Sequence, residues 1–288
     1  MNDMDEHQME ADKKITISKK SSESFIRAYQ SPYYQILLFK GTGSFMVDFT
    51  EYKFSGNTVL FLTPYQHFQW TTTAQTDIES LEFHGDFYCI EYHKKEVACN
   101  GLLFNNIYLF PHIQVQEETY KEIIFTTKKM ETESRLNSPY SDAILKSYLQ
   151  LILALCSKEK SEQLADINPD KLHFKETTAF QNLVERYFKE ERAVSFYAAK
   201  LGLTANTFSK KIKQQFGKTP SKIIQDRVVL EAKKLIHLTN KSVKEVAGEL
   251  NFQDEFYFSR YFKKTVGISP QQFREQVGIS VVANSSME

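Results

Sequence analysis

Residues Ser242–Phe273 read SVKEVAGELNFQDEFYFSRYFKKTVGISPQQF, and this stretch decides the fold of the C-terminal region. Its first part places an apolar residue at every third or fourth position, which predicts a helix with one apolar face. Asn251 follows where that helix must stop, because asparagine tolerates the left-handed backbone conformation that often ends a helix. Asp254 then supplies an acceptor suited to capping the N-terminus of a second helix. The stretch therefore predicts a helix, a tight turn and another helix.

The predicted second helix has an apolar face and a basic face. Phe258 and Phe262 lie four residues apart and can both point inward. Polar and basic side chains occupy the opposite face: Ser259, Arg260, Lys263 and Lys264. Gly267 ends the helix, and Ser269-Pro270 opens another one as a cap and a first-turn proline. Two helices with a short turn and a basic outer face are typical of helix-turn-helix modules that read the major groove of DNA.

The same pattern occurs upstream, in Val194–Ile224, which reads VSFYAAKLGLTANTFSKKIKQQFGKTPSKII. Before the turn, matching positions such as Leu201 and Leu250 are 49 residues apart. After the turn, matching positions such as Phe208 and Phe258 are 50 residues apart, because one residue is inserted in the second turn. A repeat this consistent predicts two related modules.

Two further helices complete this region. Thr219-Pro220 begins a predicted helix that runs to about Leu238 and carries an apolar stripe. That helix would hold the two modules at a fixed separation. Glu176–Lys189 predicts an opening helix that packs against the first module.

Charge is distributed unevenly along the chain. The 288 residues contain 36 Lys and Arg and 36 Asp and Glu, so the formal net charge is zero. Residues 171–280 alone contain 20 basic and 11 acidic residues, and the rest of the chain carries the opposite excess. This asymmetry indicates that the C-terminal region is the part that meets nucleic acid. The alternative is that the excess charge is only solvated surface.

The C-terminal region, from about residue 175 to 280, resembles the DNA-binding domain of AraC/XylS-type transcription regulators. The residues that carry the resemblance are Ala198, Leu201, Gly202, Phe208, Ser209, Gly217, Pro220, Arg227, Ala232, Leu235, Val246, Ala247, Phe252, Tyr257, Phe258, Ser259, Arg260, Phe262, Lys263, Lys264, Gly267, Ser269 and Pro270. Asn251 stands where the family usually has glycine, and Phe256 is a bulky apolar residue where the family often contacts a base.

The resemblance implies double-stranded DNA as the partner of this region, and it leaves room for RNA polymerase as another. The residues expected at the DNA are Ala205, Asn206, Ser209, Lys210, Lys213, Glu255, Phe256, Ser259, Arg260, Lys263 and Lys264. Arg260 is the better candidate for reading a base, because its planar guanidinium can donate two hydrogen bonds to one base. Lys210 offers only a single charged group on a flexible side chain. The alternative is that Arg260 pairs with Glu255 or Asp254 and contacts only phosphate.

The N-terminal region, from about Ile15 to Phe110, has the pattern of β-structure. We expect strands over Tyr33–Lys40, Ser44–Phe49, Thr58–Leu62, Ile78–Phe83 and Asp86–Ile90, with turns at Gly41-Thr42-Gly43 and Gly56-Asn57. Short strands between turn residues suggest a sandwich or small barrel. The arrangement resembles the cupin-like sensory domain of many AraC-type regulators. The fold class expected for the whole chain is therefore α+β in two domains, the second all-α.

The resemblance also implies a small-molecule effector in the N-terminal domain. The side chains expected to line its pocket are His67, Phe68, Trp70, Phe83, His84 and Phe87. The alternative is that these rings are simply core. We expect no metal and no cofactor, because the His-x-His pair, glutamate and later histidine of a metal-binding cupin are missing.

Helical patterns follow the predicted β-structure. After an extended stretch expected at residues 105–110 and a loop at Pro111-His112, one helix is expected from about Glu117. Another is expected over Ser141–Ser157, with two neighbouring apolar stripes. One stripe contains Ile144, Tyr148, Leu151 and Leu155, and the other contains Leu145, Leu149 and Ile152. One stripe could pack on the strands and the other on a second copy of the chain, although both could also be buried within one domain. The dimerising helices of the resembled family favour a homodimer.

These patterns give the expected domain boundaries. Residues 1–14 are expected to be a disordered N-terminus, 15–160 a cupin-like effector-binding and dimerisation domain, 161–174 a linker, 175–280 the DNA-binding domain and 281–288 a frayed C-terminus. Neither a signal peptide nor an uninterrupted apolar run of about 18 residues is present, so a cytoplasmic location is expected.

Two classes of function remain open at this stage. The first is a sequence-specific transcription regulator that responds to an effector and has no catalytic residues. The second is an enzyme joined to a DNA-binding domain, either a metal-dependent cupin or a DNA-alkylation repair protein. The repair protein would need a reactive cysteine cluster near the N-terminus, and the first cysteine of this chain is Cys89. Cys89, Cys99 and Cys156 are too irregularly spaced to indicate a disulfide framework or a zinc site.

Overall fold

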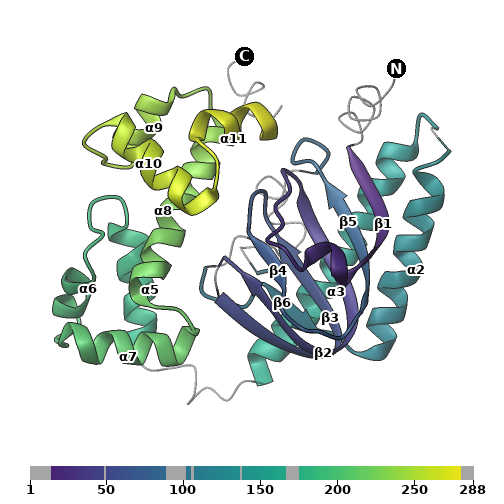
Figure 1. Cartoon of the computed structure of the whole chain (residues 1–288), viewed down its shortest axis with the longest axis horizontal. Coiled ribbons are helices and arrows are strands. Elements are labelled where there is room, and N and C mark those ends of the chain that lie inside the picture. Colours follow the sequence, from purple (N-terminus) through teal and green to yellow (C-terminus); the bar gives the residue numbers. More distant parts are fainter. Residues whose placement is uncertain are drawn as a thin grey trace. The chain divides into compact units, whose positions relative to one another are not determined.

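The structure is a computed structural model, and it describes residues 14–48, 50–88, 102–104, 107–136, 138–166 and 175–279. The chain divides into two compact units (Figure 1). The N-terminal unit contains an antiparallel sheet and two long helices, and the C-terminal unit is helical. Residues 107–110 belong to the C-terminal unit, although they precede the last strand in the sequence. The predicted α+β class with two domains is confirmed.

The N-terminal sheet is antiparallel throughout. Its strands are β1 (Ile15–Ser21), β2 (Tyr34–Val47), β3 (Thr50–Leu62), β4 (Phe68–Trp70), β5 (Asp77–Phe83) and β6 (His112–Gln114). The strand order is β1-β5-β2-β3-β6, and β4 pairs with β2. A short 3₁₀ helix, η1 (Ser22–Phe25), follows β1. The long β2 is the central element of this unit, because it pairs with β3, β4 and β5.

The turns predicted at residues 41–43 and 56–57 are wrong. Both stretches lie inside one long hairpin, in which Gly41 pairs directly with Gly56. Their φ angles of 140° and 72° lie in a region that glycine enters without strain. The two glycines therefore distort the hairpin locally, and the pairing of β2 with β3 continues through them. Gly43 has another role, because a Cβ atom there would lie 2.2 Å from Oγ1 of Thr72. The actual reversal of the chain falls beside Asp48, whose φ is 48°.

Three other local predictions also fail. The first part of the strand predicted over Asp86–Ile90 is a turn, and residues 89 and 90 lie outside the described residues. Residues 107–109, predicted as extended, form bends. The loop predicted at Pro111-His112 instead leads into β6, whose residues pair with β3 from Leu60 to Thr58.

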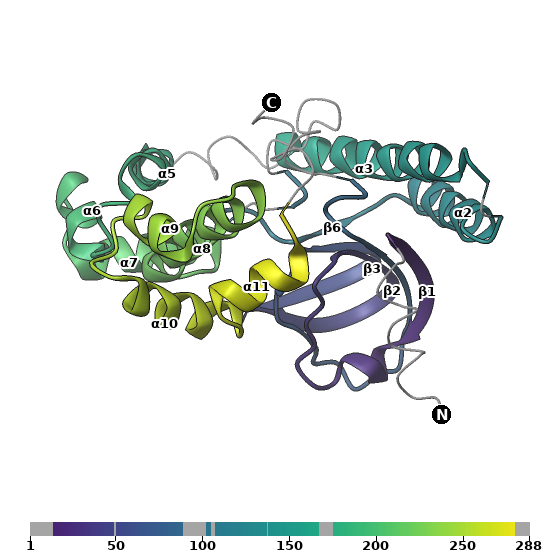
Figure 2. The ribbon, with the colours of Figure 1, turned by 90° about the horizontal axis from the view of Figure 1, so that it is seen from above.

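Two helices cover one face of the sheet (Figure 2). They are α2 (Glu117–Glu133) and α3 (Ser141–Asp166). Helix α3 continues nine residues beyond the predicted end at Ser157. The continuation reads KEKSEQLAD, which contains neither glycine nor proline and consists largely of good helix formers. Thr119 of α2 donates a 2.5 Å hydrogen bond to the buried Glu159, so the polar part of α3 is tied to its neighbour.

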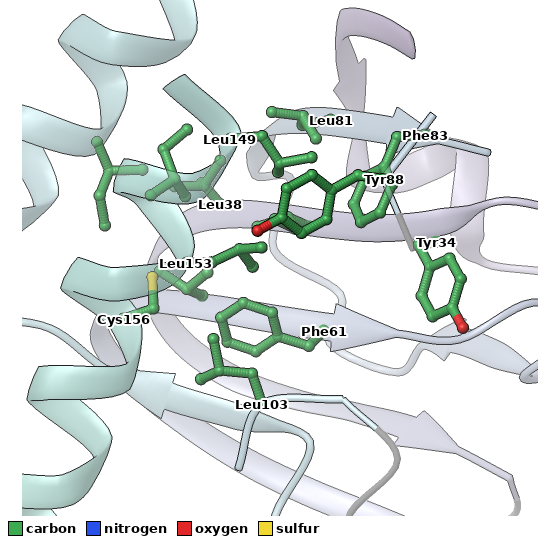
Figure 3. Close-up of a cluster of buried hydrophobic side chains, with 14 of the residues drawn as sticks. Tyr34, Leu38, Phe61, Leu81, Phe83, Tyr88, Leu103, Leu149, Leu153 and Cys156 are labelled. Atoms are coloured by element: carbon green, nitrogen blue, oxygen red, sulfur yellow. The ribbon is translucent and has the colours of Figure 1, made fainter. Parts of the chain in front are cut away.

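The sheet separates two clusters of buried side chains. The helix-side cluster joins Leu38, Phe61, Leu81 and Phe83 of the strands to Leu149, Leu153 and Cys156 of α3 (Figure 3). The aromatic cluster joins Phe25, Phe39, Phe45, Phe54, Phe68 and Trp70 with aliphatic neighbours. Alternate residues of β2 enter the two clusters, as a period of two requires: Leu38 enters the helix-side cluster and Phe39 the aromatic cluster.

The C-terminal unit is built from short helices around one long helix. The helices are α5 (Lys175–Tyr187), α6 (Val194–Lys200), α7 (Ala205–Phe216), α8 (Pro220–Leu238), α9 (Val243–Glu249), α10 (Glu255–Val266) and α11 (Pro270–Val277). Helix α8 runs between the α5–α7 group and the α9–α11 group (Figure 1). It begins and ends where the sequence predicts, with Thr219 as N-cap and Pro220 in the first turn. Within the described residues, no helix is both long enough and apolar enough to span a membrane.

Candidate nucleic-acid interface

Helices α7 and α10 are matching second helices of the two predicted modules. Each has 12 residues. Thr204 caps the N-terminus of α7, and Asp254 accepts a 2.6 Å hydrogen bond from the backbone N–H of Tyr257 at the start of α10. Gly217 and Gly267 end the two helices with φ angles of 70° and 94°. The capping residues thus begin and end α10 where the sequence predicts, and α7 ends at the matching glycine.

Buried rings fix how each helix is rotated about its axis. Phe208 of α7 packs edge-on against Phe180 of α5, with 5.1 Å between ring centroids. Phe258 of α10 packs against Phe252 at the same centroid distance, 5.1 Å. Phe208 and Phe258 are both fully buried. Because these rings hold one face of each helix against the core, the opposite face must point to solvent.

The residues predicted to contact DNA lie on those outward faces. On α7 and α10 the exposed ones are Ala205, Asn206, Lys210, Lys213, Phe256, Arg260, Lys263 and Lys264. Ser209, Glu255 and Ser259 are half-buried. The structure therefore gathers the predicted residues into two surfaces, one on each helix.

The basic side chains on these two surfaces differ from those of α8 in their ion pairing. Arg260 and Lys210 form no ion pair with any described residue, and the same holds for Lys213, Lys263 and Lys264. On α8, by contrast, Lys222 lies 2.8 Å from Asp226, and Arg227 lies 2.9 Å from Glu185. Cations held by carboxylates serve the fold, whereas the unpaired ones on α7 and α10 keep their charge available to an anionic partner.

The alternative role for Arg260 does not occur in this structure. Within the described chain, neither Glu255 nor Asp254 pairs with it. The carboxylate of Asp254 instead accepts from the N-terminus of α10. Arg260 is exposed, and its guanidinium is free to meet a base or a phosphate.

Polar contacts join the two modules inside the C-terminal unit. The guanidinium of Arg192 stacks on the ring of Phe252 at 4.0 Å and donates a hydrogen bond to the backbone oxygen of Leu250. Gln225 of α8 donates a 2.8 Å hydrogen bond to Thr265 of α10. These contacts fix the position of α10 with respect to α8 and the first module.

Ionisable groups behind the interface are held in their charged forms. Burial opposes the charge of Arg227, but its hydrogen bonds to Glu231 and Glu185 outweigh burial and raise its pKa. Backbone and side-chain hydrogen bonds from Ser242 lower the pKa of Glu245 in the capping box of α9. The carboxylate of Glu245 therefore stays negative at neutral pH and keeps its hydrogen bonds to Ser242 at the N-terminus of α9.

The six residues predicted to line an effector pocket lie in different places of the N-terminal unit. Phe68 and Trp70 are buried in the aromatic cluster, and Phe83 and Phe87 are buried in the helix-side cluster. The backbone N–H of His67 donates to Asp48, and Nδ1 of His84 lies 3.4 Å from Asp86. Effector binding by these side chains stays a prediction.

Three exposed side chains of α7 and α10 are absent from the predicted set: Thr207, Gln214 and Tyr257. Gln214 follows Lys213 on the outer face of α7, and half of Tyr257 is exposed at the start of α10. Helical spacing from Asn206 and Lys210 would have found Gln214. Spacings of three and seven residues from Arg260 and Lys264 would likewise have pointed to Tyr257, whose ring lies 5.8 Å from that of Phe252.

Comparisons with known proteins agree with this geometry. Residues 197–276, which include α7 and α10, match the family described as a helix-turn-helix domain. The HTH-type transcriptional activator RhaS of Shigella dysenteriae serotype 1 (strain Sd197) is 20% identical over 269 residues, which cover 91% of this chain and 92% of that protein. The C-terminal region is an AraC-type DNA-binding domain.

Other matches extend over different shares of this chain. The RhaS activator of Escherichia coli O139:H28 (strain E24377A / ETEC) is 25% identical over 155 residues, which cover 54% of this chain and 53% of that protein. The crystal structure of ToxT from Vibrio cholerae O395 covers 92% of this chain and 98% of its own, at 12% identity and a TM-score of 0.41.

Proposed function

We propose that this AraC-type transcription regulator places α7 and α10 in two adjacent major-groove segments of one DNA site. The proposal rests on exposed basic side chains without ion pairs, which occupy matching positions on the two helices. Lys210 and Lys213 on α7 match Arg260 and Lys263 on α10, and all four are exposed. The contacts through Arg192 and Gln225 support simultaneous binding by both modules, because they hold the two helices in one arrangement.

The N-terminal unit is proposed to regulate the DNA-binding domain through a small-molecule effector and through dimerisation. Helix α3 supports the second role. Leu145, Leu149 and Ile152 are buried in the helix-side cluster, whereas Ile144 and Leu151 of the neighbouring stripe are 36% and 40% exposed. A second copy of the chain would cover that exposed stripe. A regulator bound next to a promoter would also meet RNA polymerase.

The proposal is tested by the salt dependence of DNA binding. The full-length chain is used to select duplexes from a randomised pool, and the dissociation constant for the enriched duplex is measured over a range of salt concentrations. Each phosphate neutralised contributes about 0.9 to the slope of log affinity against log salt. Replacement of Lys263 or Lys213 by glutamine should reduce the slope by about one phosphate equivalent.

Lys53→Gln is the matched control, because Lys53 is an exposed lysine of the N-terminal unit. It should leave the slope unchanged. If no duplex is enriched, or if affinity is the same at low and high salt, the proposed function is wrong.

A further inference from the structure

Phe256 is an exposed phenylalanine on a surface that is otherwise polar. It is 70% exposed, whereas Phe258 and Phe262 of the same helix are fully buried. Large apolar side chains that face solvent on a functional surface often mark a site of interaction. No ring of the described residues stacks on Phe256, although the adjacent Tyr257 packs against Phe252.

The position of Phe256 puts it in the first turn of α10, on the basic face. Phe256, Arg260, Lys263 and Lys264 lie at spacings of four, seven and eight residues, so they form one stripe. In helix-turn-helix modules the N-terminal residues of the second helix contact base edges. If the proposed function holds, the ring therefore stands where bases are read, while the cations behind it can reach phosphate.

The chemistry of the ring limits what it can recognise. A phenylalanine ring neither donates nor accepts an ordinary hydrogen bond, and the one apolar group in the major groove is the C5-methyl of thymine. Asn206 holds the matching position in α7, and its amide can instead bond the N6 and N7 atoms of adenine. The cations beside Phe256 favour a polyanion over an apolar protein surface as its partner.

We propose that Phe256 reads the methyl group of a thymine through apolar contact, so that the second module selects thymine by shape while the first selects its base by hydrogen bonds. The inference rests on the proposed function and adds to it the class of base that the second module recognises.

The test is a uracil scan of the duplex that the full-length chain selects. Each thymine is replaced in turn by deoxyuridine, which keeps the pairing with adenine and removes only the methyl group. Burial of one methyl group contributes about 0.8 kcal/mol, so the affected position should lose affinity about fourfold. Phe256→Ala should bind the thymine and uracil duplexes equally well at that position. The exposure of Phe256 makes this substitution compatible with folding, which circular dichroism can verify.

Asn206→Ala is the matched control in the first module. It should weaken binding overall and keep the same uracil penalty in the second half of the site. If the uracil penalties are equal in the wild-type chain and in Phe256→Ala, thymine reading is wrong, whereas enrichment of a duplex and a steep salt slope would still uphold DNA binding.

Two other outcomes also overturn the inference. If Phe256→Ala binds every duplex like the wild type but loses activity in a reporter assay, the ring contacts a protein. If the chain enriches no duplex, the proposed function fails and thymine reading fails with it.

Discussion

Gly202 and Asn251 adopt the same left-handed backbone conformation at matching positions of the two turns. Their φ angles are 66° and 54°. The backbone N–H of Gly202 donates to the carbonyl of Ala199 at 3.0 Å, and that of Asn251 donates to the carbonyl of Gly248 at 2.9 Å. The second module therefore begins its longer turn in the same conformation as the first without glycine, because asparagine is one of the few other residues that enter this region readily.

This relationship predicts that alanine is worse than glycine at position 251. Asn251→Ala should lower the free energy of unfolding by about 1 kcal/mol, because alanine pays the steric penalty of the left-handed conformation. Asn251→Gly should stay within a few tenths of a kcal/mol of the wild type. The side chain is exposed, so loss of buried contacts does not enter the comparison.

Gly202→Ala serves as the parallel change in the first module, where a Cβ atom would meet no atom within 4 Å. It should also destabilise by roughly 1–2 kcal/mol, from backbone strain alone. Urea unfolding of the three variants measures the differences. Equal stability of Asn251→Ala and Asn251→Gly would contradict this account of the turn.

His112 predicts a pH dependence of stability in the N-terminal unit. Its ring lies 5.3 Å from that of Phe45, and burial together with the nearby Lys160 lowers its pKa from 6.5 to about 4. Between these values the unfolded chain binds the proton more readily than the folded chain. The contribution of neutral His112 is therefore complete above pH 6.5 and is lost as the pH falls toward 4.

His112→Gln removes this titration. Between pH 7 and pH 4 the wild type should lose on the order of 2 kcal/mol more stability than the variant. Thermal unfolding of both proteins across that range gives the comparison. Parallel stability curves for the two proteins would mean that His112 titrates alike in the folded and unfolded chains.

The C-terminal domain could be predicted closely because its signals are local. Asp254, Thr219 and Gly267 each fix a helix end through their own backbone or side-chain chemistry, and the structure keeps those ends. The repeat adds a second, independent copy of the same signals. What the sequence could not supply is the pairing of Arg227 with Glu185, which are 42 residues apart, and hence which cations remain unpaired.

The N-terminal sheet was harder to predict because its strands depend on distant partners. Gly41 and Gly56 carry the same local signal as turn residues, and only their pairing across β2 and β3 reveals a deformed ribbon. Strand β4 has three residues and forms because Phe68 pairs with Val47. Strand β6 pairs with β3 across more than 50 residues of sequence. Such contacts leave no periodic pattern in a short segment.

A charge placed on the exposed apolar stripe of α3 should weaken dimerisation. Leu151→Asp should weaken the proposed dimer at least tenfold, because it places a carboxylate in an apolar contact at a cost of a few kcal/mol. Leu151 is a better choice for this test than Tyr148, which packs partly against the helix-side cluster. Sedimentation velocity of the full-length chain measures the change.

Leu136→Asp is the control for the dimer experiment. It adds the same charge in place of another exposed leucine, which is 63% exposed and lies between α2 and α3. This variant should remain dimeric. A folded Leu151→Asp protein that stays dimeric would place the interface elsewhere.

Arg260 and Lys210 should respond differently when arginine is replaced by lysine at one position and lysine by arginine at the other. Both are exposed at matching positions of the two second helices, and neither forms an ion pair with a described residue. Arginine can bond O6 and N7 of guanine together, whereas lysine offers a single flexible charge. Arg260→Lys should therefore weaken binding to the selected duplex by roughly 1–3 kcal/mol and relax the preference at one base pair.

Lys210→Arg should change neither affinity nor preference by a comparable amount, because a phosphate contact needs only the charge. Binding of both variants to a series of singly substituted duplexes separates the two roles. A base-reading Arg260 loses affinity mainly where the substituted base pair is the guanine that it bonds. If Arg260→Lys instead weakens every duplex by the same factor, Arg260 holds phosphate, and the preference at that base pair must come from other residues of α10.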